Sequence, residues 1–268
     1  ASDAGAPAAP SLPEKWVCLT FDDGPSKTTP EVLAALDAAG VHGTFFVVAT
    51  DYNEKYLPLL TEAASAGHQI ALHSASHEYS DIYRSSAAYW RDIALLKERS
   101  RQIRPDALLM GEVWEDASNK TAYGRRRRYF TNAELDSVMN YPFRTAILDF
   151  MRGRDDGRNL RETVLSIVEN YPAQVVSCNM NLLGTHDTPR ILTALVDDFD
   201  GSREEKAHRH LSRNQLEVAR DRLMMASFLQ YVLPGSPSLY YADEAGMEGY
   251  KDPFNRRTYP WGREDQEL

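Results

Sequence analysis

The sequence predicts an α/β protein, specifically a single TIM-like (β/α) barrel of seven βα units. Short apolar runs alternate with longer amphipathic stretches, a pattern typical of βα units and a parallel sheet. The length of 268 residues is close to the roughly 250 residues of one such barrel. Polar residues crowd the C-terminal ends of the predicted strands, the edge at which these barrels build their sites from loops.

Seven apolar runs are predicted as strands, and six amphipathic stretches are predicted as helices. The predicted strands are residues 16–21, 44–48, 69–73, 107–112, 137–141, 175–185 and 238–242. The predicted helices are residues 29–39, 54–66, 87–101, 143–152, 159–171 and 204–232. Residues 1–13 are rich in Ala and Pro without periodicity, which predicts a flexible lead-in.

The composition narrows the class of partner. A formal charge of −9 gives no overall attraction to nucleic acid or to anionic lipid, since such binding depends on clustered Lys and Arg. The sequence contains no run of about 18 apolar residues, which a membrane-spanning helix would need, so a soluble chain is expected. The charge favours a neutral or weakly charged substrate. Cys18 and Cys178 are too few for a thiolate zinc site, and their apolar surroundings predict buried thiols.

Two strand ends in the first half carry groups that suit a metal ion. Asp22 and Asp23 end the first predicted strand just before a Gly-Pro turn, and His73 and His77 follow the third. Two imidazoles four residues apart can converge on one ion if the segment turns helically, with a carboxylate as third ligand and water in the fourth position. A second, unligated carboxylate can then act as general base. The alternative is an exposed His pair without a ligand.

The segments 20–26, 43–48 and 67–77 are similar to three ordered segments of the polysaccharide deacetylase (NodB-like) family. The resemblance covers residues 14–97 and implies that Asp22 is the catalytic base, while Asp23, His73 and His77 hold zinc or a similar divalent ion. Two later segments of that family, an Arg-x-Pro motif and an Asp-Trp segment, are missing from this sequence.

The second half resembles a different family. Four segments, residues 108–114, 136–141, 181–190 and 235–247, are similar to the fifth to eighth strand regions of α-amylase-type glycosidases. The resemblance is greatest to neopullulanases and cyclomaltodextrinases. The resemblance implies that Glu112 is the general acid and that Asp187 stabilises the transition state. It places His186 and Arg190 beside the sugar hydroxyls.

A retaining glycosidase also needs a carboxylate nucleophile, and the Gly-x-Arg-x-Asp segment that supplies it in this family is absent from the sequence. Trp114, Tyr141 and Trp261 are candidates to stack on sugar rings, with burial in the core as the alternative. Two structural alternatives also stay open: a Glu112 carboxylate that pairs with an Arg, and an Asp187 that caps a helix.

The two resemblances change over inside one predicted helix, where Tyr89, Trp90, Ile93 and Leu96 form its apolar stripe. The predicted organisation is therefore a lead-in at 1–13, deacetylase-like units at 14–98 and amylase-like units at 99–268. A change from one family to the other within a helix preserves the alternation of strands and helices. The two half-barrel fragments are therefore expected to form one composite barrel.

Three functions fit these observations, all with an oligo- or polysaccharide as partner. The first is weak metal-dependent deacetylation of acetylated sugars through a zinc-bound water. His186 is a candidate for the general acid, which a Leu-x-His motif supplies in the deacetylase family. The second is an α-glucan glycosidase that lacks its nucleophile. The third is a catalytically silent barrel that serves as scaffold or carbohydrate binder.

Overall fold

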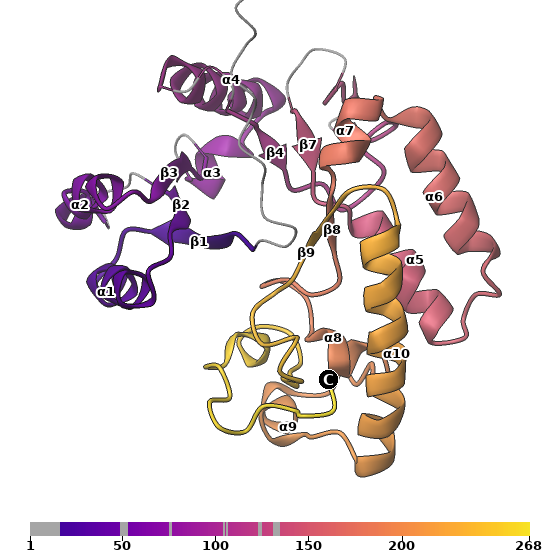
Figure 1. Ribbon diagram of the computed structural model, residues 1–268. Helices are drawn as coiled ribbons and strands as arrows, with labels where there is room; N and C mark the ends of the chain where they lie inside the picture. Colours follow the sequence, from indigo (N-terminus) through magenta and orange to yellow (C-terminus); the bar gives the residue numbers. More distant parts are fainter. Residues whose placement is uncertain are drawn as a thin grey trace, which may run out of the picture. The chain divides into compact units, whose positions relative to one another are not determined.

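The computed structural model describes residues 17–268 apart from 49–52, 75–76, 104, 106, 123–124 and 131–134 (Figure 1). The predicted lead-in at 1–13 lies outside the described residues. The chain divides into two compact units, an N-terminal unit that ends at Ala107 and a C-terminal unit that begins at Leu108. In the described part of the chain, no helix has the length and apolar character needed to cross a membrane.

The N-terminal unit is built on a three-stranded parallel sheet in the order β1-β2-β3. Its elements are β1 (Leu19–Gly24), α1 (Thr29–Ala39), β2 (Gly43–Val47), η1 (Glu54–Tyr56), α2 (Leu59–Ser65), β3 (Gln69–Leu72), α3 (Tyr79–Ile82) and α4 (Ser86–Ile103). Each strand is followed by a helix, as the alternation of apolar runs and amphipathic stretches predicts.

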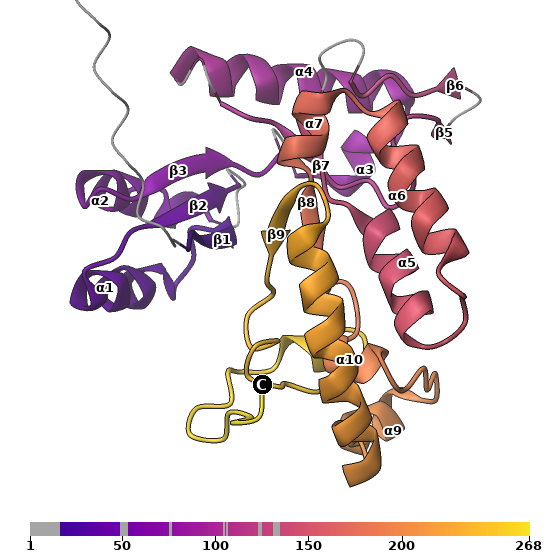
Figure 2. The ribbon, with the colours of Figure 1, turned by 45° about the vertical axis from the view of Figure 1, so that its right-hand side comes forward.

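The core of this unit lies between the sheet and the helices α1 and α2, which flank it in Figure 2. Leu33 and Leu36 of α1 pack against Phe45 and Val47 of β2, and Ala63 of α2 completes the cluster. Phe45 and Val47 face the same side because side chains alternate along a strand. Burial of each large apolar side chain contributes about 1.5–3 kcal/mol, so the sheet edge that carries the polar strand ends rests on a packed base.

The C-terminal unit contains a second row of parallel strands. Its elements are β4 (Met110–Gly111), β5 (Thr121–Ala122), β6 (Arg125–Arg126), β7 (Ser137–Val138), α5 (Tyr141–Met151), α6 (Arg158–Asn170), α7 (Ala173–Cys178), β8 (Met180–Leu182), α8 (Ile191–Ala194), α9 (Arg203–His208), α10 (Arg213–Val232), β9 (Ser236–Ser238) and η2 (Phe254–Arg256). β4 pairs with β7 and β8 pairs with β9, and a single bridge between Met139 and Met180 links the two pairs. The strands therefore follow the order β4-β7-β8-β9, all parallel, while β5 and β6 form a separate hairpin.

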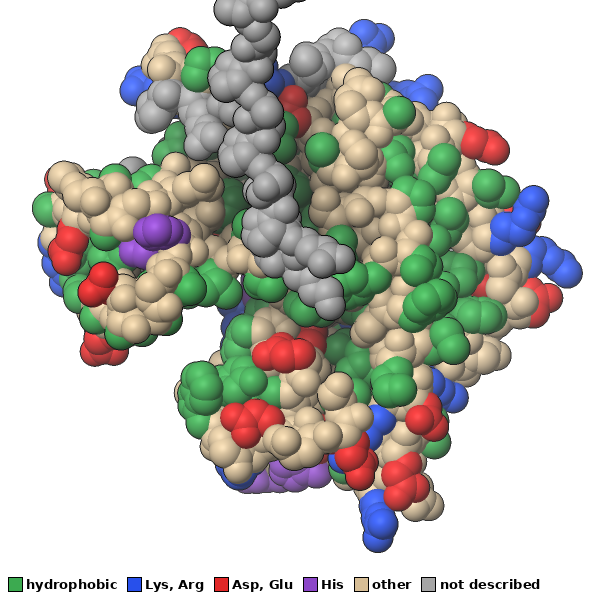
Figure 3. All heavy atoms as spheres, in the orientation of Figure 1, with side chains coloured by type: hydrophobic (Ala, Val, Ile, Leu, Met, Phe, Trp, Pro, Cys, Tyr) green, Lys and Arg blue, Asp and Glu red, His purple; other side chains and the backbone are tan. Residues whose placement is uncertain are grey.

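The helix α10 packs on β8 and β9 and on the helices α5 and α8 (Figure 2). Ala219, Leu223 and Ala226 line its buried side. Its other side exposes large apolar side chains, including Met224 and Phe228, and hydrophobic atoms lie along this helix in Figure 3.

Several predictions about this fold are wrong. The predicted strand 238–242 overlaps β9 at Ser238 alone, where that strand ends. The predicted strand 175–185 begins as the helix α7 and is extended only over β8; Val175 and Val176 are both buried, which suits neighbouring positions of a helix better than the alternating faces of a strand. The predicted helix 204–232 is two helices, α9 and α10, because Ser202 and Ser212 each form a capping box that starts a new helix. The Cys18 thiol is exposed and that of Cys178 is half-buried.

Candidate functional site

Three predicted metal ligands converge at the C-terminal edge of the N-terminal sheet. Asp23 stands at the end of β1, while His73 and His77 follow β3. The Nε2 atom of His73 lies 3.5 Å from Asp23 Oδ1, and that of His77 lies 3.7 Å from the same oxygen. Because β1 and β3 flank β2, their strand ends are about 10 Å apart, a gap that side chains reaching inward from both strands can close.

The backbone aims these side chains through left-handed conformations. Asp23 has φ 63°, and the register of β1 against β2 shifts between Asp22 and Gly24, as at a β-bulge that redirects a side chain. Ser74 and His77 have φ 70° and 53°. At these two positions the backbone is left-handed, which a right-handed helix is not, so the two imidazoles come together without the helical turn that was set as the condition for their convergence. His73 itself is held by its N–H, which donates to Val47 O at 2.8 Å.

The three side chains fit a small divalent ion. Ligands about 2.1 Å from a tetrahedral zinc lie about 3.4 Å from one another, and the two distances from Asp23 Oδ1, 3.5 and 3.7 Å, are close to this spacing. The donors are two imidazole nitrogens and a carboxylate oxygen, the set found at catalytic zinc sites. Their side chains are 38%, 45% and 65% exposed for His73, His77 and Asp23, so a fourth position is open to water.

Asp22 stands next to this group without joining it. Its backbone pairs with Phe46 in the sheet, and its side chain is exposed. The group of ligand atoms that lie within 4.8 Å of one another contains Asp23, His73 and His77. The structure thus separates the two adjacent carboxylates, one within the ligand group and one beside it.

A second group forms in the C-terminal unit, from Glu112 after β4 and from His186 and Asp187 after β8, again with ligand atoms within 4.8 Å of one another. His186 Nε2 lies 3.5 Å from Asp187 Oδ2. Arg256 donates a hydrogen bond of 3.1 Å to Asp187 Oδ1. Asp187 does not cap α8, because that helix starts after Arg190. An Arg was expected to pair with Glu112, but the arginine described at this group, Arg256, pairs with Asp187.

Trp114 and Tyr141, both predicted to contact sugar, are stacked on each other with centroids 3.9 Å apart and an interplanar angle of 15°. Trp114 is 47% exposed, whereas Tyr141 is 1% exposed. The Tyr141 hydroxyl donates to Glu112 Oε1 at 3.0 Å, and burial raises its pKa above the usual value, which keeps it a neutral donor. Its place in the first turn of α5 turns it inward, so Tyr141 orients Glu112 and only Trp114 offers a ring face to a ligand.

Arg190 also occupies a structural place instead of the predicted position beside sugar hydroxyls. Its side chain is fully buried and pairs with Asp243 Oδ1 at 3.2 Å. The Tyr240 and Tyr241 rings lie 4.3 Å from its guanidinium carbon, and it donates to the Tyr241 carbonyl. Burial raises the pKa of the Asp243 carboxyl to about 7, although the charge of Arg190 opposes this shift.

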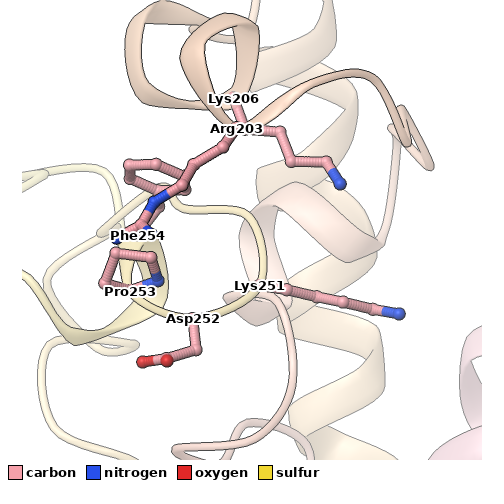
Figure 4. Close-up of a pocket in the computed structure, with 6 residues that line it drawn as sticks. All are labelled: Arg203, Lys206, Lys251, Asp252, Pro253 and Phe254. Atoms are coloured by element: carbon pink, nitrogen blue, oxygen red, sulfur yellow. The ribbon is translucent and has the colours of Figure 1, made fainter.

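Two cavities of the C-terminal unit lie away from these groups. One of about 210 Å³ is lined by Arg203, Lys206, Lys251, Asp252, Pro253 and Phe254 (Figure 4). The other, of about 380 Å³, is lined largely by charged side chains between α5 and the segment after α8. Lys206 pairs with Asp200, and Arg152 pairs with Asp198, so ion pairs within the chain already occupy much of this charge. No predicted site residue lines either cavity.

Sequence reasoning missed three residues that complete these groups. Ser74 and Asp92 lie behind His77, where Ser74 Oγ donates to Asp92 Oδ2 at 3.0 Å. Arg256 reaches Asp187 across 69 positions of the chain. No local sequence pattern predicts contacts between residues so far apart in the chain. Ser74 does lie in a segment on which the deacetylase resemblance rests.

Comparisons with known proteins agree with both resemblances. The family model described as Alpha amylase, catalytic domain matches residues 71–267, and the model described as Polysaccharide deacetylase matches residues 9–121. An amylopullulanase of Thermoanaerobacter thermohydrosulfuricus is 41% identical over 177 residues, which cover 62% of this chain and 11% of the relative. A cyclomaltodextrinase of Thermoanaerobacter pseudethanolicus is 34% identical and is covered to 25% of its length, against 66% of this chain.

Solved structures give the same picture. A cyclomaltodextrinase matches with a TM-score of 0.52 at 26% identity, over 75% of this chain and 28% of its own. A cyclic alpha-maltosyl-(1→6)-maltose hydrolase from Arthrobacter globiformis matches with a TM-score of 0.54 at 17% identity, over 88% of this chain and 68% of its own. These likenesses show a TIM-barrel-type α/β fold, and the chain spans about a tenth to a quarter of the length of the two sequence relatives named above.

Proposed function

The chain belongs to the alpha-amylase family, and because residues 9–121 also match the polysaccharide deacetylase model, we propose that it is a carbohydrate-active hydrolase that removes acetyl groups from sugars at the Asp23–His73–His77 site. The observation that supports this proposal is the convergence of three zinc-type donors at one sheet edge, with Asp23 Oδ1 3.5 and 3.7 Å from the two imidazoles. The reaction consumes one water and yields acetate and a free sugar hydroxyl or amine.

The chain's own residues divide the work of this reaction. Asp23, His73 and His77 hold the ion, which when bound supplies Lewis-acid chemistry: it polarises a carbonyl and lowers the pKa of water toward about 7. Asp22, exposed at the same strand end, accepts the proton of the attacking water on its carboxylate. The division matches the geometry, because Asp22 stands outside the ligand group and so keeps both oxygens free of the ion.

Asp22→Asn should lower acetate release from N- and O-acetylated oligosaccharides at least about 100-fold, since a general base contributes about 10²–10⁴-fold. Zinc affinity should change little, because Asp22 is not in the ligand group. Acetate is measured on the zinc-loaded chain, with the chelated chain as blank. Asp37→Asn, the same substitution at an exposed residue of α1, is the control, and acetate release that Asp22→Asn leaves intact would exclude this mechanism.

A second candidate function is α-glucan binding at Glu112, His186 and Asp187. The specific observation in its favour is the exposed ring of Trp114 next to this group. Hydrolysis there would require a carboxylate nucleophile, and the segment that carries it in the amylase relatives is absent from the sequence. Loss of a nucleophile removes several orders of magnitude of rate, so binding without cleavage is the expected behaviour.

Trp114→Ala should weaken maltoheptaose binding by about 2- to 13-fold, because an aromatic contact is worth about 0.5–1.5 kcal/mol beyond the area it buries and each 1.4 kcal/mol is a factor of ten. Titration calorimetry measures this, with Phe228→Ala as the control, since Phe228 is an exposed aromatic residue of the same unit for which no sugar contact is predicted. An equal loss of affinity in both variants would show that maltoheptaose does not bind at Trp114. Release of reducing sugar by the parent would contradict binding without cleavage, and a parent that neither binds nor releases anything is a silent scaffold.

The closure of both units into one composite barrel of seven βα units is also our proposal. It is supported by parallel strands in both units, three in the order β1-β2-β3 and four in the order β4-β7-β8-β9. A change of family within α4, as the sequence predicts, preserves the alternation of strands and helices. One cooperative unfolding transition for the whole chain is the expected signature, and urea unfolding measures it.

A further inference from the structure

A hydrogen-bonded link joins the metal site to the helix α4. Ser74 Oγ accepts the backbone N–H of His77 at 3.0 Å and donates its own proton to Asp92 Oδ2 at 3.0 Å. We propose that Asp92 is a positioning residue of the metal site, which acts through Ser74 to hold His77 in the geometry that binds the ion. This inference rests on the proposed metal site.

The turn that carries His77 needs such support. Ser74 and His77 have φ 70° and 53°, and a left-handed conformation is unfavourable for an ordinary residue because it brings Cβ too close to the following carbonyl oxygen. In the absence of restraint, this cost favours right-handed conformations that swing the imidazole away from Asp23. The Ser74 hydroxyl ties together the two strained residues, because it belongs to one and receives the N–H of the other.

Asp92 gives this hydroxyl a fixed reference. It lies half-buried on α4, a helix of 18 residues that contacts β3. A hydroxyl can rotate, and an acceptor on one side fixes the direction of its proton and leaves its lone pairs toward the His77 N–H. A carboxylate acceptor makes this bond stronger than a neutral one. The helix thereby determines the position of a ligand that follows a different element.

The expected size of the effect follows from metal sites in general, where loss of a partner behind a ligand lowers affinity about 10- to 100-fold. Asp92→Ala should weaken zinc binding by this factor. Asp92→Asn keeps an oxygen that accepts from the Ser74 hydroxyl, so its affinity should stay within about threefold of the parent. Ser74→Ala breaks the link at its centre and should resemble Asp92→Ala, whereas Ser74→Thr keeps the hydroxyl and should restore binding.

The experiment measures zinc affinity by competition with a chromophoric chelator, and the cobalt-loaded absorption spectrum reports the coordination geometry. Glu98→Ala is the matched control, because it removes a carboxylate from the exposed side of the same helix. Thermal unfolding of each metal-free variant shows that the fold is intact. If Asp92→Ala does not fold, the Ser74→Ala and Ser74→Thr pair tests the same link.

The outcomes separate the two proposals. A parent that binds zinc, with Asp92→Ala at least tenfold weaker, Asp92→Asn near the parent and Glu98→Ala unchanged, supports the positioning role. Asp92→Ala as tight as Glu98→Ala overturns it and leaves the metal site standing. Asp92→Asn as weak as Asp92→Ala would assign the effect to charge and overturn the hydrogen-bonded link. A parent without zinc affinity overturns the metal site itself.

Discussion

His77→Ala should lower the affinity of the metal-free chain for zinc on the order of 100-fold. A four-ligand zinc site is worth about 10–16 kcal/mol, so one ligand carries about 3 kcal/mol, and each 1.4 kcal/mol is a factor of ten. His77 is one of the three donors that this group has among the described residues, and water replaces it poorly because it brings no fixed geometry. Calorimetric titration of the stripped chain measures the change and should also give one zinc per parent chain.

His42→Ala is the control for this titration, because His42 is an exposed histidine of the same unit outside the ligand group. It should bind zinc like the parent. If His77→Ala keeps the parent's affinity, the ion is bound elsewhere and the proposed site is wrong. If neither the parent nor the control binds zinc, the convergence of the three side chains has no metal function.

Asp243→Ala should lower the free energy of unfolding by about 3–5 kcal/mol at pH 8. The substitution leaves the fully buried guanidinium of Arg190 without its carboxylate, and an uncompensated buried charge costs about this much. The Tyr240 and Tyr241 rings, each 4.3 Å from the guanidinium carbon of Arg190, attract the cation but do not neutralise it. Urea unfolding followed by far-UV circular dichroism measures the loss.

Asp198→Ala is the matched control, since Asp198 pairs with Arg152 and Arg154 but is 67% exposed. An exposed ion pair contributes about 0–1 kcal/mol, so a small effect is expected. An equally small effect of Asp243→Ala would mean that Arg190 is not held by its charge partner. The same curves test the composite barrel: a single transition that both zinc and Asp243→Ala shift supports closure, whereas two transitions that respond separately contradict it.

The pH dependence of stability gives a second view of Asp243. Its pKa is about 7 in the folded chain against the ordinary value of 3.8, so the folded state binds this proton more tightly than the unfolded state. The stabilisation is therefore complete below about pH 4 and is lost as the pH rises through about 7. Asp243→Asn should remove this part of the pH dependence, and an unchanged profile in the variant would contradict the assignment.

The sequence allowed accurate prediction where local signals decide the structure. The helix 29–39 was expected with the bounds that α1 has, since Pro30 near its start and Gly40 at its end are boundary residues that sequence reveals. The division between α9 and α10 could also have been found, because Ser202 with Glu205 and Ser212 with Gln215 match the capping box in sequence.

Contacts between distant segments were beyond this reasoning. That Tyr141 would be buried and Trp114 exposed, although both carried the same prediction, depends on how α5 packs against the strand ends. The burial of Arg190 likewise depends on Asp243, 53 positions later. The ligand group was predicted because strand ends of a parallel sheet share an edge, but the Ser74–Asp92 link behind it needs the position of α4.

The left-handed residues at the proposed metal site limit which substitutions the site can accept. Valine or isoleucine at position 74 or 77 would meet the steric penalty of positive φ in its most severe form, while asparagine and glycine would meet the least. A lineage that loses the His77 ligand is thus expected to accept Asn or Gly there and to keep the turn. The left-handed turn would then be kept in a descendant that no longer binds an ion.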